Sequence, residues 1–304
     1  MTDVARRARV SQATVSYIVN NVTKYSITDE TRAAVERAIA ELGYQPNAQA
    51  RSLASGTSGV AVCVIPPVPL GEPVLRLLGA LTVEFARRGL TMTVHFERSG
   101  DQSFRDMVRA LKPQVVFSLF GSDPRAGMVD LGSSSLIDPG CALQVDHLVT
   151  MGHSQLAFIG SAEPELARQS GAREASVLHH AQARRLPPVR TAAMPTAPEE
   201  AAALVRDWSD AGVTGVCANN DEVALGLVRA IRDAGLSCPG DMSVVGYDAS
   251  AVGAVSLPAL TSIAWDADRA APIVAALAVG EQPSVSPAEV LNVHLVERES
   301  VARR

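Results

Sequence analysis

The sequence lacks the segments and motifs that mark membrane proteins, secreted proteins and many enzymes. No run of about 18 apolar residues occurs in its 304 residues, and the N-terminus is polar and charged rather than signal-like. There is no GxGxxG after the first expected strand, no P-loop and no HExxH. We therefore expect a cytoplasmic protein that is neither secreted nor membrane-spanning and is not an enzyme.

Cysteine and histidine are too sparse and too scattered to indicate a metal site. The four cysteines are Cys63, Cys141, Cys217 and Cys238. They form no CxxC and have no paired histidine, so neither a zinc site nor a disulfide framework is expected. The neighbouring His179 and His180 have no serine or cysteine at motif spacing, and we interpret them as solvent-facing on a helix. No cofactor is predicted.

An overall positive charge is also missing, since the net charge is −5. On its own this value argues against nucleic acid as a partner. The charge is unevenly distributed, however: residues 1–56 hold seven Lys or Arg against five Asp or Glu, and the remainder holds 20 against 27. A weakly basic head on an acidic body is expected to turn the head toward DNA and keep the body away from it.

Residues 3–20, DVARRARVSQATVSYIVN, have the pattern of a helix-turn-helix. The two apolar stripes at helical spacing consist of Val4, Ala5 and Ala8, then Val15, Ile18 and Val19. Ser11 stands where the second helix needs an N-cap. The residues left facing outward include Gln12, Ala13, Ser16 and Tyr17. The alternative is a three-helix bundle whose small helices only pack on each other.

A third helix is predicted from Thr28 to Leu42, with Thr28 as N-cap and Gly43 as C-cap. The segment YQPNAQARSLASG follows at residues 44–56, and Pro46 favours the start of a short helix that runs through Leu53. A helix of about two turns is marginal alone in water, so this one needs a partner to form.

These residues resemble the headpiece and hinge of the LacI/GalR family of bacterial transcription regulators, without a gap from Asp3 to Gly56. In that family the hinge helices of two subunits pair over DNA and insert a leucine into a minor-groove step. The resemblance implies DNA binding by Gln12, Ala13, Thr14, Ser16, Tyr17, Asn47, Ala50 and Leu53. Leu53 would be the inserted leucine, and Gln12 can pair bidentately with adenine.

Two departures from the family pattern bear on this interface. Arg9 stands at the turn where the family usually has Gly; a non-glycine residue there carries a modest strain, and its side chain offers a phosphate contact. Tyr17 stands where many members have a base-reading Arg, so the preferred operator should differ from the common one.

From Gly59 onward, short apolar segments alternate with amphipathic helices, which indicates a parallel doubly wound sheet. A second such series begins at HSQLAFIG, so the body should be bilobal. Ligands of open α/β sheets bind at the carboxyl ends of the strands, here in the cleft between lobes. The body also resembles the family's effector-binding core, which is similar to periplasmic sugar-binding proteins.

The resemblance implies three effector-binding residues, Arg168, Asn220 and Asp221. Asp221 could instead cap the helix that it begins, and both roles can hold together. Arg168 could instead be a solvent-exposed helix charge. Asp248 is followed by Ala249 where a second acid is common, which removes another effector contact.

The segment between PQVVFSLFG and MGHSQLAFIG is short for the family. Within it DLGSSSLIDPG, residues 130–140, reads as a loop, so the first lobe looks trimmed by roughly one βα unit. We expect a headpiece at 1–43, a hinge at 44–56 and a core at 57–304. The first lobe would take about 57–142 and 264–284, and the second about 143–263 and 285–300.

The sequence thus predicts an all-α helix-turn-helix headpiece followed by an α/β core of two doubly wound sheets. The expected protein is a transcription regulator that acts as a repressor. We expect it to bind a pseudo-palindromic DNA operator as a homodimer, under control of a small sugar-like effector. Two alternatives are a transporter's solute-binding protein, which the headpiece excludes, and a ligand-independent regulator with a degenerate core.

Overall fold

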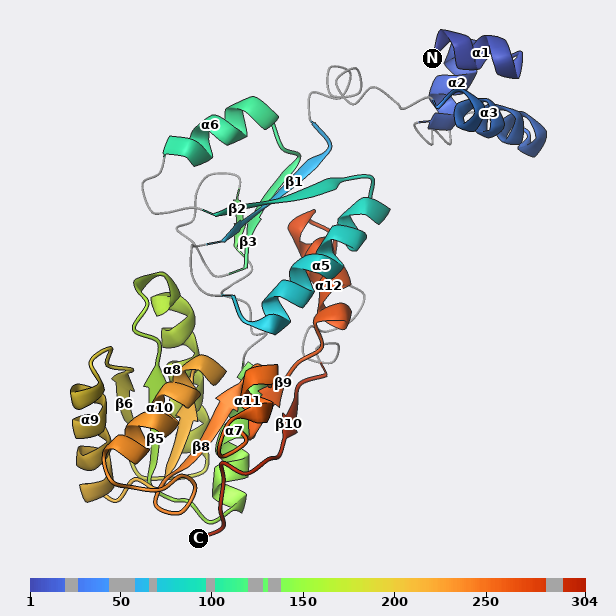
Figure 1. Cartoon of the computed structure of the whole chain (residues 1–304). Coiled ribbons are helices and arrows are strands. Elements are labelled where there is room, and N and C mark those ends of the chain that lie inside the picture. Colours follow the sequence, from blue (N-terminus) through green and yellow to red (C-terminus); the bar gives the residue numbers. More distant parts are fainter. Residues whose placement is uncertain are drawn as a thin grey trace. The chain divides into compact units, whose positions relative to one another are not determined.

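The computed structural model describes residues 1–19, 27–43, 58–65, 70–96, 102–119, 128–130, 138–282 and 292–304. The chain divides into two compact units, Met1–Ser58 and Gly59–Arg304 (Figure 1). We call the first the headpiece and the second the core unit. The short helix expected between Pro46 and Leu53 lies outside the described residues.

The headpiece consists of the helices α1 (Thr2–Ala8), α2 (Gln12–Val19) and α3 (Asp29–Leu42). They bury one small cluster made of Val4, Ala5, Val15, Ile18, Val35 and Ala38. The predicted caps are present: Ser11 Oγ accepts the Thr14 N–H at 3.0 Å and Thr28 Oγ1 accepts the Thr31 N–H at 3.3 Å. Gly43 ends α3 in the left-handed conformation, as glycine does without strain.

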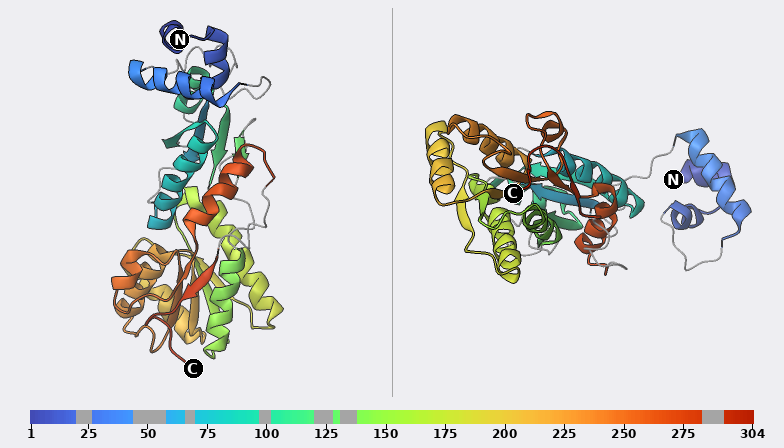
Figure 2. Two further views of the ribbon diagram at one scale, coloured as in Figure 1. Left: turned by 90° about the vertical axis from the view of Figure 1, so that its right-hand side faces the viewer. Right: turned by 90° about the horizontal axis from the view of Figure 1, so that it is seen from below.

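The core unit begins with a four-stranded sheet in the order β2-β1-β3-β4, and every described pairing in it is parallel. Its strands are β1 (Val60–Ile65), β2 (Thr91–Phe96), β3 (Val115–Ser118) and β4 (Met128–Asp130). The helices α5 (Glu72–Arg87) and α12 (Ala267–Ala278) lie side by side on one face, and α6 (Gln102–Leu111) covers the other (Figure 2). We call this part the first lobe.

The period of two along β1 explains this three-layer packing. Ala61, Cys63 and Ile65 join the apolar cluster under α5 and α12, whereas Val62 and Val64 pack with Phe104 of α6. A strand covered on both faces needs apolar residues at successive positions, and residues 61–65 are all buried.

The second lobe is built on a six-stranded sheet in the order β10-β9-β8-β7-β5-β6. Its strands are β5 (Leu156–Gly160), β6 (Arg190–Ala193), β7 (Gly215–Ala218), β8 (Ser243–Tyr247), β9 (Ser262–Ala264) and β10 (His294–Val296). Only β10 pairs antiparallel among these strands. The associated helices are α7 (Asp138–Thr150), the 3-10 turn η1 (Pro164–Leu166), α8 (Ala167–Ala183), α9 (Pro198–Asp210), α10 (Asp221–Asp233) and α11 (Ala251–Val255).

The segment that we expected to be a loop, residues 130–140, is structured at both ends, so that expectation is wrong there. Asp130 ends β4, and Asp138–Gly140 begin α7, where Pro139 suits the first turn of a helix. A three-residue strand is too short to show the period-two pattern from which strands are predicted. Only residues 119–127 separate β3 from β4, fewer than the dozen or so usual between parallel strands.

The two lobes exchange chain segments. After β9 the chain supplies α12 to the first lobe, and it then returns to the second lobe as β10. All of α7 packs on the second sheet and on α8, so the expected lobe boundary at residue 142 falls inside this helix. No helix within the described ranges is long and apolar enough to cross a bilayer.

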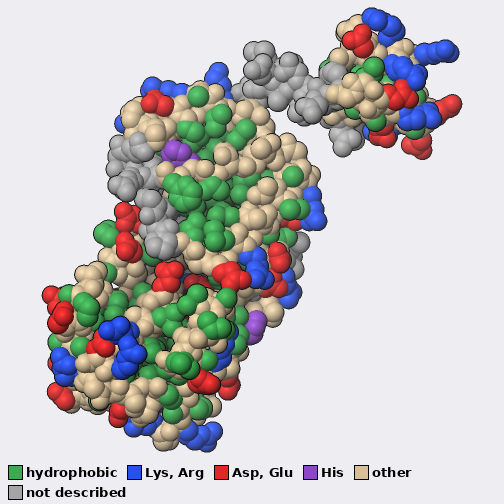
Figure 3. Space-filling view, viewed as in Figure 1, with side chains coloured by type: hydrophobic (Ala, Val, Ile, Leu, Met, Phe, Trp, Pro, Cys, Tyr) green, Lys and Arg blue, Asp and Glu red, His purple; other side chains and the backbone are tan. Residues whose placement is uncertain are grey.

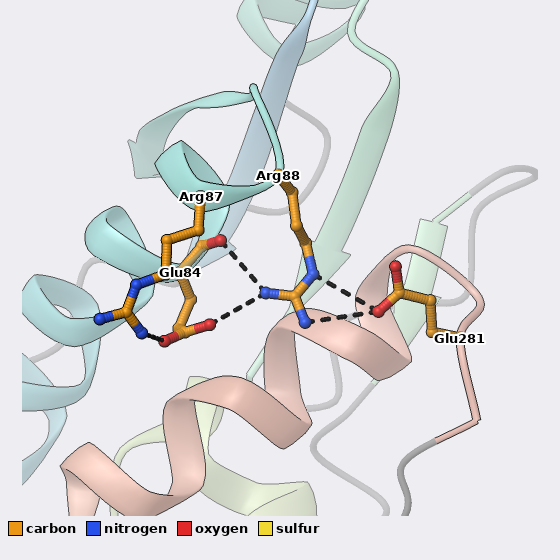
Figure 4. Close-up of polar contacts among 4 residues, drawn as sticks. All are labelled: Glu84, Arg87, Arg88 and Glu281. Atoms are coloured by element: carbon orange, nitrogen blue, oxygen red, sulfur yellow. Dashed lines mark hydrogen bonds and ion pairs between the residues drawn. The ribbon is translucent and has the colours of Figure 1, made fainter. Parts of the chain in front are cut away.

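A polar network fastens the C-terminal end of α5 to the residues that follow α12 (Figure 4). The Glu84 side chain is mostly buried. Its carboxylate oxygens form ion pairs with guanidinium nitrogens of Arg87 at 2.5 Å and of Arg88 at 3.0 Å. Arg88 also reaches Glu281 at 3.3 Å. One guanidinium therefore joins the end of α5 to the segment that follows α12, and the two helices also share an apolar cluster in the first lobe.

Candidate functional site

Helix α2 presents a polar outward face next to the start of α1. Gln12 and Ala13 are exposed, and Thr14, Ser16 and Tyr17 are half-buried, while Val15 and Ile18 are turned into the core. The Gln12 amide donates to Thr2 Oγ1 at 2.9 Å, an exposed bond that leaves the carbonyl oxygen available. All five predicted residues of α2 thus lie outside the fully buried core. Asn47, Ala50 and Leu53 fall outside the described residues.

A cavity of about 330 Å³ lies between elements of the two lobes. Its walls come from the start of α5, the loop after β8, the β9–α12 junction and the approach to β10; the lining includes Glu72, Arg76, Asp248, Trp265, Asp268 and His294. Figure 3 shows charged side chains along the boundary of the two lobes on the face in view. A ligand in this cavity would contact both lobes at once.

Asp248 is an acid in the wall of this cavity. Its Oδ1 accepts the Trp265 indole N–H at 3.2 Å, and Oδ2 lies 3.7 Å from the position that a Cβ on Gly71, the N-cap of α5, would occupy. Burial raises the pKa of Asp248 to about 6, although the nearby Arg173 works in the opposite direction. The backbone at Asp248 has φ 105°, a conformation strained for any residue but glycine.

Arg173 of α8 lies beneath the sheet's carboxyl edge rather than on the surface. It is 4% exposed, and its guanidinium carbon is 3.8 Å from the centroid of the Tyr247 ring, a cation–π contact. One guanidinium nitrogen donates to the backbone oxygen of Asn219. Arg173 Nε and both amide atoms of Asn219 are buried without a hydrogen-bond partner among the described residues. Buried polar atoms in this state point to a bound molecule or water.

The three predicted effector residues occupy three different environments. Asn220 is half-buried and caps α10, since its Oδ1 accepts the Val223 N–H at 2.9 Å, which leaves its amide N–H groups as donors. Arg168 is exposed near the start of α8. Asp221 is 2% exposed.

The Asp221 carboxylate accepts hydrogen bonds from other residues of the second lobe. Its oxygens accept the Ser250 N–H at 2.6 Å and the Ser262 hydroxyl at 2.5 Å, and burial raises its pKa. A Cβ on Gly246 would come within 2.2 Å of Asp221 Oδ1, so β8 needs glycine there. The structure therefore gives Asp221 an internal bonding role and does not place it on the cavity wall with Asp248.

Arg173 is not among the residues predicted from the sequence, because the resemblance to the family points to Arg168. A signal was present: Ser170, Arg173, Val177 and Ala181 recur at helical spacing, and all four are buried. An arginine on the buried stripe of a helix must find a polar partner or a ligand.

The geometry defines a class of protein: a helix-turn-helix headpiece joined to a two-lobed core with a cavity between the lobes. Residues 1–47 match the bacterial regulatory proteins of the lacI family, and residues 145–301, just over half of the chain, match the periplasmic binding protein-like domain. The chain belongs to the LacI family of bacterial regulatory proteins.

Individual relatives agree with this assignment. The lactose operon repressor of Escherichia coli is 29% identical over 290 residues, covering 87% of this chain and 79% of the relative. The regulator GalS of Salmonella typhimurium is 27% identical over 340 residues, covering 99% and 96%.

Solved structures show the same fold. The lac repressor dimer bound to operator and the anti-inducer ONPF superposes with a TM-score of 0.69 at 25% identity, over 99% of this chain and 98% of that one. The regulator CelR in complex with cellobiose superposes with a TM-score of 0.63 at 24% identity, over 98% of each chain.

Proposed function

We propose that this protein is a sequence-specific DNA-binding transcription regulator, a repressor that acts as a homodimer and is controlled by a small sugar-like ligand. The observation that carries the proposal is the exposed polar face of α2, set on a helix-turn-helix whose caps and buried stripe are those expected. The relatives named repressors and the lac repressor dimer on its operator support it. Operator DNA as the target implies work in the bacterial cytoplasm.

Base reading falls to the N-terminal half of α2. Gln12 and Ala13 are exposed at the end that enters the major groove in this motif, and Tyr17 lies one turn later. Thr14 and Ser16 are assigned to the DNA backbone. One headpiece offers few contacts, so two are required on a pseudo-palindromic site, and Asn47, Ala50 and Leu53 are assigned to the hinge contacts at its centre.

Effector binding falls to the cavity between the lobes. Asp248 lines this cavity and supplies a carboxylate acceptor. Asn220 is not a lining residue, but it follows the neighbouring strand β7, and we assign its amide N–H groups as donors. Arg173 is buried and does not line the cavity, but its charge acts on Asp248 and it donates to the backbone oxygen of Asn219. We assign the positively charged contact to it rather than to the exposed Arg168. Hydrogen bonds between charged groups and ligand hydroxyls contribute about 1.5–3 kcal/mol each, enough to select a polyhydroxylated ligand.

A ligand can control DNA binding because both lobes contribute residues to the lining of the cavity. A ligand that touches both lobes has different contacts when the angle between them changes, and only such differential binding can shift a conformational equilibrium. The ligand therefore favours one lobe arrangement, and the operator favours one as well.

Operator release tests the proposal. The full chain is bound to an operator obtained by binding-site selection, and neutral sugars are added while binding is followed by fluorescence anisotropy. We expect at least one sugar to change operator affinity in the parent but not in Asp248→Asn. Tight operator binding that no compound changes would support the ligand-independent alternative, and failure to select any operator would refute DNA reading itself.

A further inference from the structure

A groove on the headpiece gathers three of its arginines, away from the α2 surface. It has a volume of about 310 Å³ and is lined by Arg7, Ala8, Arg9, Ala34, Arg37, Ala38 and Glu41. The three arginines are exposed and the alanines between them are not. The alanine side chains are too small to fill the groove, and the arginine side chains are long enough to reach a bound molecule in it.

The groove lies on the side of α1 that faces α3. The Arg7 guanidinium pairs with Glu41 of α3 at 2.6 Å, whereas Thr2 of α1 bonds to Gln12 of α2. The helix–helix contacts of α1 are thus shared between α2 on one side and α3 on the other. The groove is therefore distinct from the outward face of α2 assigned to base reading.

The charge balance of the groove favours an anion. Three guanidinium groups face a single carboxylate, and neither Arg9 nor Arg37 pairs with an acid among the described residues. The Arg7–Glu41 pair is half-exposed on both sides, and such pairs contribute little, so an incoming anion can compete for Arg7. Guanidinium groups bind phosphate oxygens in a bidentate manner.

Arg9 is held in this groove at a conformational cost. It ends α1 with φ 55° and ψ 43°, the left-handed conformation that glycine adopts freely. The closing backbone bonds, from the Arg9 N–H to Arg6 and from the Val10 N–H to Ala5, would be made equally well by glycine. The backbone bonds therefore do not explain why arginine rather than glycine stands here. We attribute the arginine to the interactions of its side chain.

We propose that the groove formed by Arg7, Arg9 and Arg37 is a phosphate-binding site of the headpiece. The phosphate can belong to a DNA backbone segment other than the one under α2, or to a small phosphorylated molecule. The chemistry is the same in both cases: three guanidinium donors around one tetrahedral dianion or phosphodiester.

The primary test uses inorganic phosphate as the probe. The full chain is labelled with ¹⁵N-arginine, and phosphate replaces chloride at constant ionic strength while the side-chain Nε–Hε signals are followed. We expect saturating shifts of the signals that Arg9→Gly and Arg37→Gln remove. Each of these variants should weaken phosphate binding by about tenfold, the value of one lost charge-assisted hydrogen bond.

Arg6→Gln is the matched control. Arg6 lies in the same last turn of α1 and carries the same charge, but it does not line the groove. It should leave phosphate affinity nearly unchanged. Shifts that do not saturate, or equal losses in all three variants, would overturn the proposal. Arg9→Gly should melt no lower than the parent, so its loss of binding cannot be attributed to unfolding.

A second measurement identifies the source of the phosphate. Affinity for a duplex without operator is measured over a range of salt concentrations. If the groove binds a DNA backbone, Arg9→Gly and Arg37→Gln should each reduce the salt slope by about 0.9, and Arg6→Gln should not. An unchanged slope beside weakened inorganic phosphate binding assigns the groove to a small phosphorylated molecule.

Discussion

At the scale of single residues, Asp248, which we assign to the effector, has features that oppose folding. It is half-buried in the cavity wall, its backbone has positive φ, and desolvation raises its pKa to about 6. A glycine would relieve the backbone strain at this position, and it would also remove the desolvated carboxylate. Residues that lower stability while facing a cavity are typical of binding sites.

We expect Asp248→Asn to stabilise the core unit at pH 7.5. Because the folded-state pKa exceeds the ordinary value, the folded chain keeps a proton that the unfolded chain releases between about pH 4 and 6, and stability from this group falls as pH rises through that window. Asparagine avoids the loss, so the free energy of unfolding in urea should rise by about 1–3 kcal/mol at pH 7.5 and hardly at pH 4. The indole bond from Trp265 can be kept by the amide oxygen.

Asp241 provides a control of opposite sign. Its bonds from the Ser237 hydroxyl and N–H lower its pKa, so Asp241→Asn should destabilise the protein at pH 7.5. Stability changes of the same sign in both variants would contradict the electrostatic account of Asp248.

Gln12→Ala should cost about 1–3 kcal/mol at one base pair of each half-site and relax the preference there, because a bidentate base contact is lost. The measurement is binding-site selection with parent and variant. Uniform weakening on every sequence would instead make Gln12 a backbone contact. Tyr17→Arg, by comparison, should shift the preferred half-site toward guanine.

At the scale of elements, the first lobe depends on α5 and α12, which are far apart in the sequence but pack along their lengths. The apolar contacts between them are reinforced by Glu84, Arg88 and Glu281 at one end (Figure 4). This end is remote from the cavity, which contacts the opposite end of α5. Substitutions in this network should therefore change the stability of the protein without changing its affinity for a ligand in the cavity.

Arg88→Met should lower the free energy of unfolding by about 1–3 kcal/mol, since Glu84 is mostly buried and would keep Arg87 alone as its partner. The measurement is urea denaturation. Arg76→Met is the matched control on the same helix: its pair with Glu72 is exposed, so the change should stay within about 0.5 kcal/mol. Equal changes in the free energy of unfolding for Arg88→Met and Arg76→Met would show that the Glu84 network stabilises the protein no more than an exposed ion pair does.

How far the sequence predicts these elements depends on their length and pattern. The helices with wide apolar stripes, such as α5 and α10, and the fully apolar strands carry the alternation of strands and helices that the sequence predicts for the core. β4 was not predicted, since three residues carry no period, and the start of α7 was hidden by Gly, Ser and Pro. At the site, the face of α2 follows from local pattern and Asn220 follows from the resemblance to the family. The contact of Arg173 with the Tyr247 ring and its electrostatic effect on Asp248 require the tertiary fold.

At the scale of the whole molecule, one unit is assigned to DNA and the other to a ligand, so regulation requires that the two binding events be coupled. Coupling between two ligands is reciprocal by thermodynamic necessity. The factor by which the effector changes operator affinity must equal the factor by which the operator changes effector affinity. Titrating each ligand in the absence and presence of the other measures both factors, and a factor of one in both directions would show that effector binding and operator binding are not coupled.

The most direct test of the central claim, that this chain reads DNA sequence through α2, is binding-site selection with the purified full-length protein on random duplexes. We predict one enriched pseudo-palindromic motif for the parent, and for Gln12→Ala a motif that loses preference at symmetric positions in its two halves. An unenriched pool, or the same motif from parent and variant, would contradict the claim.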